Sequence, residues 1–148
     1  MKKLYVVNIC VILIIALTAG ITKMPVNKEK KIKSLITNRI EILNDYYLEK
    51  YNYETAFDKL AKVEYGQLLK RDLKNFEDYK QTDIDEIVHY SIKKLNIRES
   101  GYGYLEGNTE IFWVIKDLEK EYKSKNKYEF MCQKINGKYK ITKFDVKI

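Results

Sequence analysis

Apolar and polar positions divide the chain into one continuous apolar run and a longer stretch of periodic segments. The run covers residues 4–21, follows Lys2 and Lys3, and contains no charged side chain. At 1.5 Å per residue it makes about 27 Å of α-helix, enough to cross a thin bilayer. The pattern predicts a membrane segment over residues 1–23 and one folded domain over residues 24–148.

The membrane segment also has the layout of a secretory signal peptide, with a basic start, an apolar centre and small residues near its end. Its apolar run exceeds the length of about 7–15 residues that is usual for the centre of a signal peptide. This length favours an uncleaved transmembrane helix, whereas cleavage would give a secreted protein. Because long domains translocate largely regardless of flanking charge, we expect the domain outside the cytoplasm, held at the cell membrane by a single pass.

The first half of the domain repeats apolar side chains every three or four positions, which predicts three amphipathic helices. The first helix follows Asn27, a favourable N-cap, carries Glu29 in its first turn and reaches about Tyr51. Asn52 then interrupts the pattern. A short second helix around residues 56–61 and a third around residues 65–79 complete the helical half.

The second half changes to a period of two, which indicates strands. We expect a first strand over residues 88–93 and a glycine-punctuated loop over residues 96–108. The uninterrupted apolar run at 111–115 suits a central strand covered on both faces. Residues 124–126 are predicted to form a turn.

The final hairpin is the most specific local signal. Asn136-Gly137 suits a two-residue type I′ turn, because both central residues of that turn need positive φ. Such a turn would place Ile141 opposite Cys132. The inward-facing positions then change parity, which predicts a β-bulge near residues 142–143.

Helices followed by strands indicate an α+β fold, with about three helices packed on a curved antiparallel four-stranded sheet. The segment from Tyr53 to Phe57 and the hairpin from Tyr128 to Ile141 make residues 28–148 resemble the nuclear-transport-factor-2-like (NTF2-like), or cystatin-like, superfamily, as a small membrane-anchored extracytoplasmic member. The resemblance implies a cone-shaped fold whose sheet and helices can enclose a pocket. That superfamily includes isomerases, dehydratases, binding proteins and scaffolds of secretion machines, so the fold alone leaves the function open.

The formal net charge of +7 changes this picture little. It indicates a lysine-rich surface rather than a nucleic-acid site, which would need a basic stripe with interleaved aromatic residues. Lys28, Lys30, Lys31 and Lys33 follow the membrane segment directly. We expect these four membrane-proximal lysines to attract anionic lipid headgroups.

The sequence has no motif for a catalytic centre, a metal or a cofactor. His89 is predicted to face solvent, and Cys132, the one cysteine of the domain, to be a buried apolar residue. An isomerase would need two carboxyl groups facing each other across an apolar pocket, and we expect no such pair. Asp45 and Glu49 come nearest, and both are predicted to face solvent.

Four aromatic residues are the candidates for binding. Tyr102 and Tyr104 belong to the glycine-rich loop, where tyrosine supplies a large contact area at low entropic cost. Tyr90 and Trp113 would line a pocket if the fold encloses one, and would otherwise pack in the core.

Together these features predict a non-enzymatic, membrane-anchored module outside the cytoplasm that binds other envelope proteins. We expect no cofactor, no metal and no nucleic acid. Two alternatives stay open. One is a scaffold subunit of a conjugation or secretion machine, and the other is a secreted protein with a pocket for a small ligand.

Overall fold

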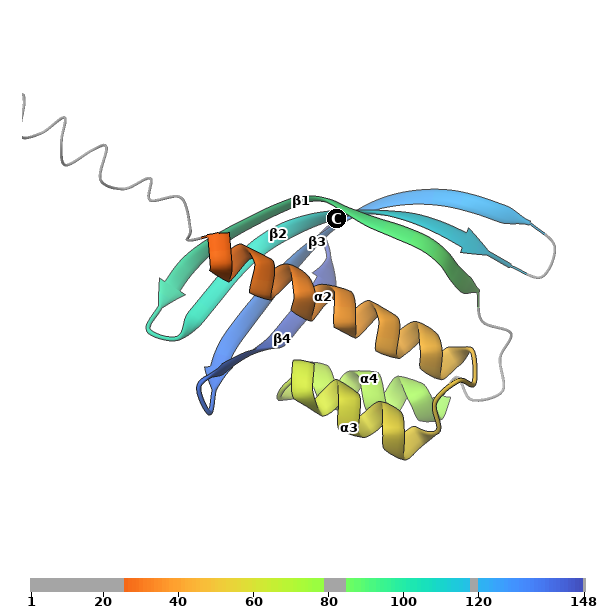
Figure 1. Cartoon of the computed structure of the whole chain (residues 1–148), viewed down its shortest axis with the longest axis horizontal. Helices are drawn as coiled ribbons and strands as arrows, with labels where there is room; N and C mark the ends of the chain where they lie inside the picture. The colour runs from red at the N-terminus through yellow and green to blue at the C-terminus, as the bar shows by residue number, and fades with distance from the viewer. Residues whose placement is uncertain (1–25, 79–84, 118–119, 148) are drawn as a thin grey trace, which may run out of the picture.

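The computed structural model describes residues 26–78, 85–117 and 120–147 (Figure 1). Three helices come first, namely α2 (Val26–Tyr47), α3 (Tyr53–Val63) and α4 (Gln67–Asp78). Four strands follow, namely β1 (Glu86–Gly101), β2 (Tyr104–Lys116), β3 (Glu121–Ile135) and β4 (Lys138–Val146). The predicted membrane run, residues 4–21, lies outside the described residues. Within the described part, no helix combines the length and the apolar character that a membrane crossing needs.

The four strands form one antiparallel sheet in the order β1-β2-β3-β4. The sheet is curved, and all three described helices lie on its concave side (Figure 1). α2 crosses that side, and α3 and α4 pack between α2 and the edge strand β4. This arrangement confirms the predicted α+β class, the three helices and the four-stranded sheet.

The concave side of the sheet is filled by the apolar stripe of α2. Ile32, Ile36 and Ile40 recur at every turn of the helix and are 0%, 0% and 4% exposed. They pack in one cluster with the sheet residues Leu105, Ile111, Trp113, Phe130, Cys132, Ile141 and Phe144. Burying each isoleucine stabilises the fold by about 1.5–3 kcal/mol, so this contact forms the main core.

A smaller core holds α3 and α4 against the second half of α2. The rings of Tyr46 and Phe76 stack with their centroids 3.8 Å apart. α2 ends at Tyr47 rather than Tyr51, because the chain turns at Glu49, which adopts a φ of 58°. Asn52 begins the next helix, since its side chain accepts a hydrogen bond of 2.8 Å from the Thr55 amide.

The predicted β3–β4 hairpin is confirmed in its turn, its register and its bulge. Asn136 and Gly137 have φ values of 49° and 80°, as a type I′ turn requires. Cys132 lies opposite Ile141, and Met131 lies opposite Lys143. Residue 142 is therefore the extra residue of a β-bulge on β4.

Two predicted loops are wrong, because both belong to long strands. Residues 96–108 do not form a loop: β1 continues to Gly101 and β2 begins at Tyr104, so only a tight turn remains between them. Residues 124–126 are not a turn but the middle of β3, paired with residues 111–113 of β2. In both places hydrogen bonds to the neighbouring strand hold a polar or glycine-rich segment in the sheet. Local residue propensity takes no account of such pairing.

The apolar run at 111–115 is confirmed as part of a central strand. Ile111 and Trp113 face α2 and are buried at 0% and 8% exposure. On the opposite face Val114 is 9% exposed, and the Lys93 ammonium lies 5.9 Å from the centroid of the Phe112 ring. Side chains of neighbouring strands, rather than a second layer, cover this face.

Gly107 shows why a glycine is required in the middle of β2. A Cβ atom built there would lie 2.0 Å from the Asn96 carbonyl oxygen and 2.7 Å from Cζ of Phe130. Phe130 is 1% exposed and cannot move aside without opening the core.

We predict that Gly107→Ala lowers the free energy of unfolding by about 1–3 kcal/mol or more, through overpacking against Phe130. Urea denaturation of the variant and the wild type measures the difference. Asn108→Ala is the matched control, because the exposed neighbouring side chain leaves the core unchanged. Equal stabilities of the two variants would contradict the close contact.

Candidate functional site

The structure brings two of the four predicted binding residues together. Tyr90 and Trp113 lie directly opposite each other on β1 and β2, with ring centroids 6.0 Å apart. Tyr128 and Phe144 continue this row across the sheet, with successive centroid distances of 6.1 Å and 4.9 Å. The row faces the helices, and Trp113 is buried, so Trp113 acts as a core residue.

Tyr102 and Tyr104 lie apart from that row. Trp113 lies nine positions after Tyr104 in β2, a distance of about 30 Å along the strand. Tyr102 is fully exposed in the β1–β2 turn, and Tyr104 is 39% exposed with its hydroxyl accepting a 2.8 Å hydrogen bond from Gln133 Nε2. The four aromatic residues therefore do not form one site.

The four predicted membrane-proximal lysines all lie on the first turns of α2. Lys30, Lys31 and Lys33 are exposed to solvent. Lys28 is half-buried and forms an ion pair with Glu99 of β1, which holds the start of the helix against the sheet.

A groove runs between α2 and the edge strand β1, with a volume of about 220 Å³. We call it the α2–β1 groove; its residues are Ile40, Glu41, Asn44 and Asp45 of α2 and Ile87, Val88, His89 and Tyr90 of β1. The side chain of Asn44 holds the two walls together. Its Oδ1 accepts from the Ile87 amide at 3.0 Å, and its Nδ2 donates to the Ile87 carbonyl at 3.3 Å.

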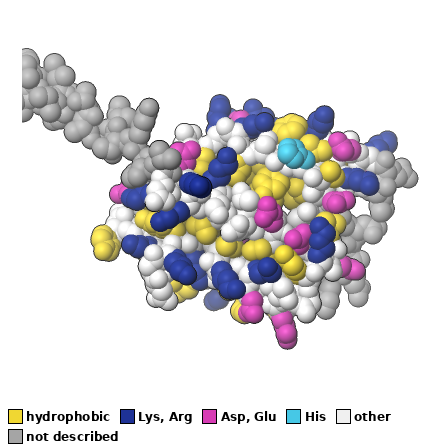
Figure 2. Space-filling view, in the orientation of Figure 1, with side chains coloured by type: hydrophobic (Ala, Val, Ile, Leu, Met, Phe, Trp, Pro, Cys, Tyr) yellow, Lys and Arg dark blue, Asp and Glu magenta, His cyan; other side chains and the backbone are white. Residues whose placement is uncertain are grey.

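The α2–β1 groove is acidic and partly apolar. Glu41 accepts a 3.1 Å hydrogen bond from the Tyr90 hydroxyl. Burial, together with the nearby Glu41 charge, raises the pKa of Tyr90, so this hydroxyl stays a donor. Val88 is 49% exposed. His89 is exposed, as predicted, and Figure 2 shows the chain's one histidine, in cyan, beside apolar side chains.

A second groove lies on the other side of the same acidic residues. It has a volume of about 370 Å³ and is formed by α2, Tyr51 and α3. Glu41 and Asp45 belong to both grooves and form a ridge between them. Asp45 forms a 3.0 Å ion pair with the exposed Lys50, and the Lys59 ammonium lies 4.8 Å from the centroid of the Tyr51 ring.

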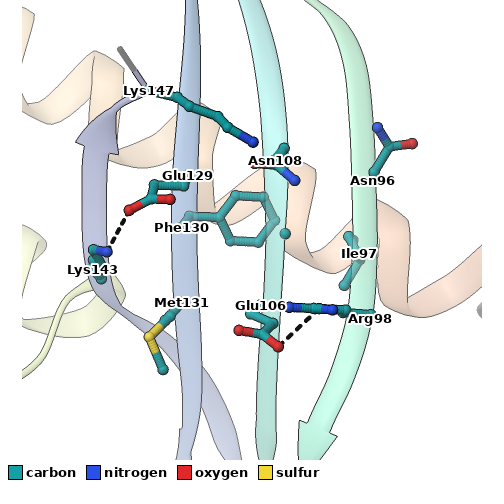
Figure 3. A pocket seen from close by; sticks show the side chains of 11 residues that line it. Asn96, Ile97, Arg98, Glu106, Asn108, Glu129, Phe130, Met131, Lys143 and Lys147 are labelled. Atoms are coloured by element: carbon teal, nitrogen blue, oxygen red, sulfur yellow. Dashed lines mark hydrogen bonds and ion pairs between the residues drawn. The ribbon is translucent and has the colours of Figure 1, made fainter.

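The face of the sheet turned away from the helices carries a third hollow, of about 320 Å³ (Figure 3). Four of its five charged side chains form ion pairs, and Lys147 is the fifth. Arg98 pairs with Glu106 at 2.8 Å, and Lys143 pairs with Glu129 at 2.5 Å. No carboxylate is thus left without an ion pair among the described residues that line this hollow.

A buried charge cluster joins the three helices, and sequence reasoning missed it. Arg39 of α2 donates from Nε to Glu64 and from Nη2 to Asp72. Glu64 is 0% exposed and Asp72 is 4% exposed, so the fold buries two carboxyl groups around one guanidinium. The signal was their spacing, because each follows a buried leucine by four residues, Leu60 and Leu68.

The surroundings of this charge cluster favour a structural role over a catalytic one. Burial raises the pKa of Glu64 to about 8; the Arg39 charge opposes this shift, and the Asp72 charge adds to it. Arg39 also lies over the Phe144 ring, 5.0 Å from its centroid. Neither carboxyl group lines any of the three hollows described above.

No protein-family model and no curated protein matches the sequence. The fold does match solved structures. One is the intermembrane space region of the chloroplast protein ARC6, at a TM-score of 0.52 and 17% identity, covering 84% of this chain and 98% of that one. Another is an NTF2-like protein of unknown function from Shewanella oneidensis, at a TM-score of 0.52 and 12% identity, covering 79% of this chain and 96% of that one. The chain therefore has an NTF2-like fold, as the resemblance implied.

We predict that Glu64 makes stability depend on pH. Its pKa rises from 4.5 to about 8 on folding, so the folded state binds more protons than the unfolded state between these values. The contribution of Glu64 is therefore fully present below pH 4.5 and is lost as pH rises through about 8. Urea unfolding between pH 4.5 and about 8 should show that the free energy of unfolding falls less with rising pH for Glu64→Gln than for the wild type. Glu129→Gln, on an exposed ion pair, should follow the wild type, and parallel curves for all three would refute the assignment.

We predict that Arg39→Ala destabilises the domain by about 3–5 kcal/mol, because it leaves the Asp72 carboxylate buried without its cation and Glu64 without its hydrogen-bond donor. The exposed pair of Arg98 and Glu106 offers a matched control, since its Arg98 side chain is 78% exposed. Arg98→Ala should change the free energy of unfolding by at most about 1 kcal/mol. Chemical denaturation measures the loss of unfolding free energy in each variant. Equal losses for Arg39→Ala and Arg98→Ala would show that the buried cluster is dispensable.

Proposed function

We propose that the protein is a membrane-tethered, non-enzymatic binding module. Its domain would lie outside the cytoplasm and hold an extended segment of another envelope protein in the α2–β1 groove. The observation that carries this proposal is that the concave side of the sheet, where a ligand chamber would lie, is filled by α2.

The filled interior weighs against the alternative of a small-ligand pocket. Ile32, Ile36 and Ile40 occupy the space between helix and sheet. The buried carboxyl groups, Glu64 and Asp72, hold Arg39 and line none of the three hollows described above. Binding energy is therefore more readily gained on the outside of the domain.

The α2–β1 groove offers the chemistry for a polypeptide partner. β1 is an outer strand, so its free edge can add an extended segment through main-chain hydrogen bonds. Asn44 already supplies to Ile87 the two hydrogen bonds that a neighbouring strand would make. Glu41 and Asp45 beside this edge favour a partner segment that carries lysine or arginine.

The rest of the β1 edge is less suited to pairing. Bulges interrupt the strand between Ile87 and His89, between Ile92 and Lys94, and again between Glu99 and Gly101. Bulges and lysines on an edge strand oppose unspecific pairing with other sheets. The regular stretch between the first two bulges, residues 89–92, begins beside the groove and is thus the place where a partner strand would fit.

The tether is supported by the uncharged run of residues 4–21. The similarity to an intermembrane space region concerns the fold alone, yet it shows that this fold occurs in a compartment bounded by membranes. A scaffold subunit of a conjugation or secretion machine remains the second candidate, and it would show self-association through the same edge of β1.

The test is site-specific photo-cross-linking in native membranes with the full-length chain. A photoreactive amino acid at Val88, in the groove, should give a discrete adduct, whereas one at Lys94 should not. Glu41→Lys combined with Asp45→Lys should abolish the Val88 adduct by repelling a cationic partner.

Lys123→Glu combined with Lys127→Glu is the matched control, because it changes two charges on the opposite face of the sheet. The adduct should survive in this control. Equal adducts from positions 88 and 94, or an adduct insensitive to the charges at 41 and 45, would overturn the groove assignment. An adduct of twice the chain's mass would favour the scaffold.

A further inference from the structure

Three segments that are distant in sequence meet at one end of the domain. The Lys28–Glu99 ion pair joins the start of α2 to the end of β1. The Lys134 amide donates a 2.8 Å hydrogen bond to the Gly103 carbonyl, which joins the β3–β4 hairpin to the β1–β2 turn. Figure 1 shows the start of α2 and both turns on the same side of the molecule. We call this the basic end; it comprises residues 27–33, 98–106 and 134–139.

The charge of the basic end is strongly positive. It carries seven cationic side chains, Lys28, Lys30, Lys31, Lys33, Arg98, Lys134 and Lys138. Its three carboxylates are Glu29, Glu99 and Glu106, and the last two are held in ion pairs. The opposite end, described at residues 85–87, 115–117 and 120–123, instead carries four carboxylates and three lysines.

Tyr102 stands at the tip of the basic end. It is fully exposed, and the glycines on both sides, Gly101 and Gly103, have φ values of 146° and 79°. No contact within the described part of the domain covers its ring. Tyrosine is enriched where a protein meets the interface between membrane and water, because its ring is apolar and its hydroxyl polar.

Chain connectivity places this end next to the predicted membrane segment. Only residues 22–25 separate the apolar run from α2, and the five Cα-to-Cα steps from residue 21 to residue 26 span at most about 17 Å. If residues 4–21 cross a bilayer, the start of α2 must therefore lie close to the bilayer surface. Arg98 near the β1–β2 turn, and Lys134 and Lys138 of the β3–β4 turn, then come within reach of lipid phosphates.

We propose that the basic end docks on an anionic phospholipid surface, with the Tyr102 ring among the headgroups and the lysines of α2 and of the β3–β4 turn on the phosphates. The inference rests on the membrane tether of the proposed function and adds a fixed orientation to it. The α2–β1 groove, about 24 Å further along α2 from Lys28 to Asn44, then faces away from the lipid.

The test uses the full-length chain with Cys10→Ser, reconstituted in vesicles of phosphatidylcholine with or without phosphatidylglycerol. Cys132 is buried, so Tyr102→Cys supplies the one accessible thiol for a polarity-sensitive fluorophore. Val88→Cys, at an exposed site toward the opposite end, is the matched control. Quenchers carried by the lipid report the depth of each label.

We expect quenching at position 102 to exceed that at position 88 by at least about twofold in anionic vesicles, and to fall when salt is raised. Lys134→Glu combined with Lys138→Glu should reduce it, whereas Lys120→Glu combined with Lys123→Glu should not. Equal quenching at both positions, in protein that floats with the vesicles, would overturn the docking and leave the tether intact. Quenching at position 102 that changes neither with phosphatidylglycerol nor with the substitutions at Lys134 and Lys138 would show that anionic lipid is not the partner. Protein that an alkaline wash removes from the vesicles would refute the tether, and the orientation with it.

Discussion

The arrangement of the helices depends on one buried guanidinium. Arg39 binds Glu64 at the end of α3 and Asp72 within α4, and it lies over the ring of Phe144 on β4. A buried charge set of this kind contributes little net stability, but it strongly disfavours arrangements that separate its members. It therefore fixes α3 and α4 at the β4 side of the sheet, where the Tyr65 amide also donates to the Ile141 carbonyl.

This placement makes the two edges of the sheet unequal. β4 is covered by the end of α3 and by α4, where Arg71 binds Asp145 and the Phe144 carbonyl. β1 stays open beside α2, and the acidic α2–β1 groove forms there. The apolar stripe of α2 meanwhile fills the concave side of the sheet. A domain with a filled interior and one open edge is suited to holding a polypeptide segment, and the basic end opposite that groove is suited to facing lipid.

Much of the fold was readable from short-range patterns. The three isoleucines of α2 recur at helical spacing, and Asn136-Gly137 determines the turn and register of the last hairpin, including the bulge at residue 142. The strand assignments failed where pairing overrode composition. Gly107 looks like a loop residue in the sequence, but pairing with β1 and β3 places it in β2, and Phe130 fills the space that a side chain would occupy.

The candidate site was predictable only in part. The exposure of Tyr102 and His89 followed from glycine content and strand parity, whereas the pairing of Tyr90 with Trp113 required the register of β1 on β2. The burial of Glu64 and Asp72, and the meeting of Lys28, Gly103 and Lys134 at one end, arise from contacts between segments far apart in the chain. Local patterns predicted the three helices and the last hairpin, because helix spacing and turn chemistry are local energies. The full length of the strands, the burial of charges and the open edge required the folded structure, because pairing and desolvation depend on neighbours that the fold brings together.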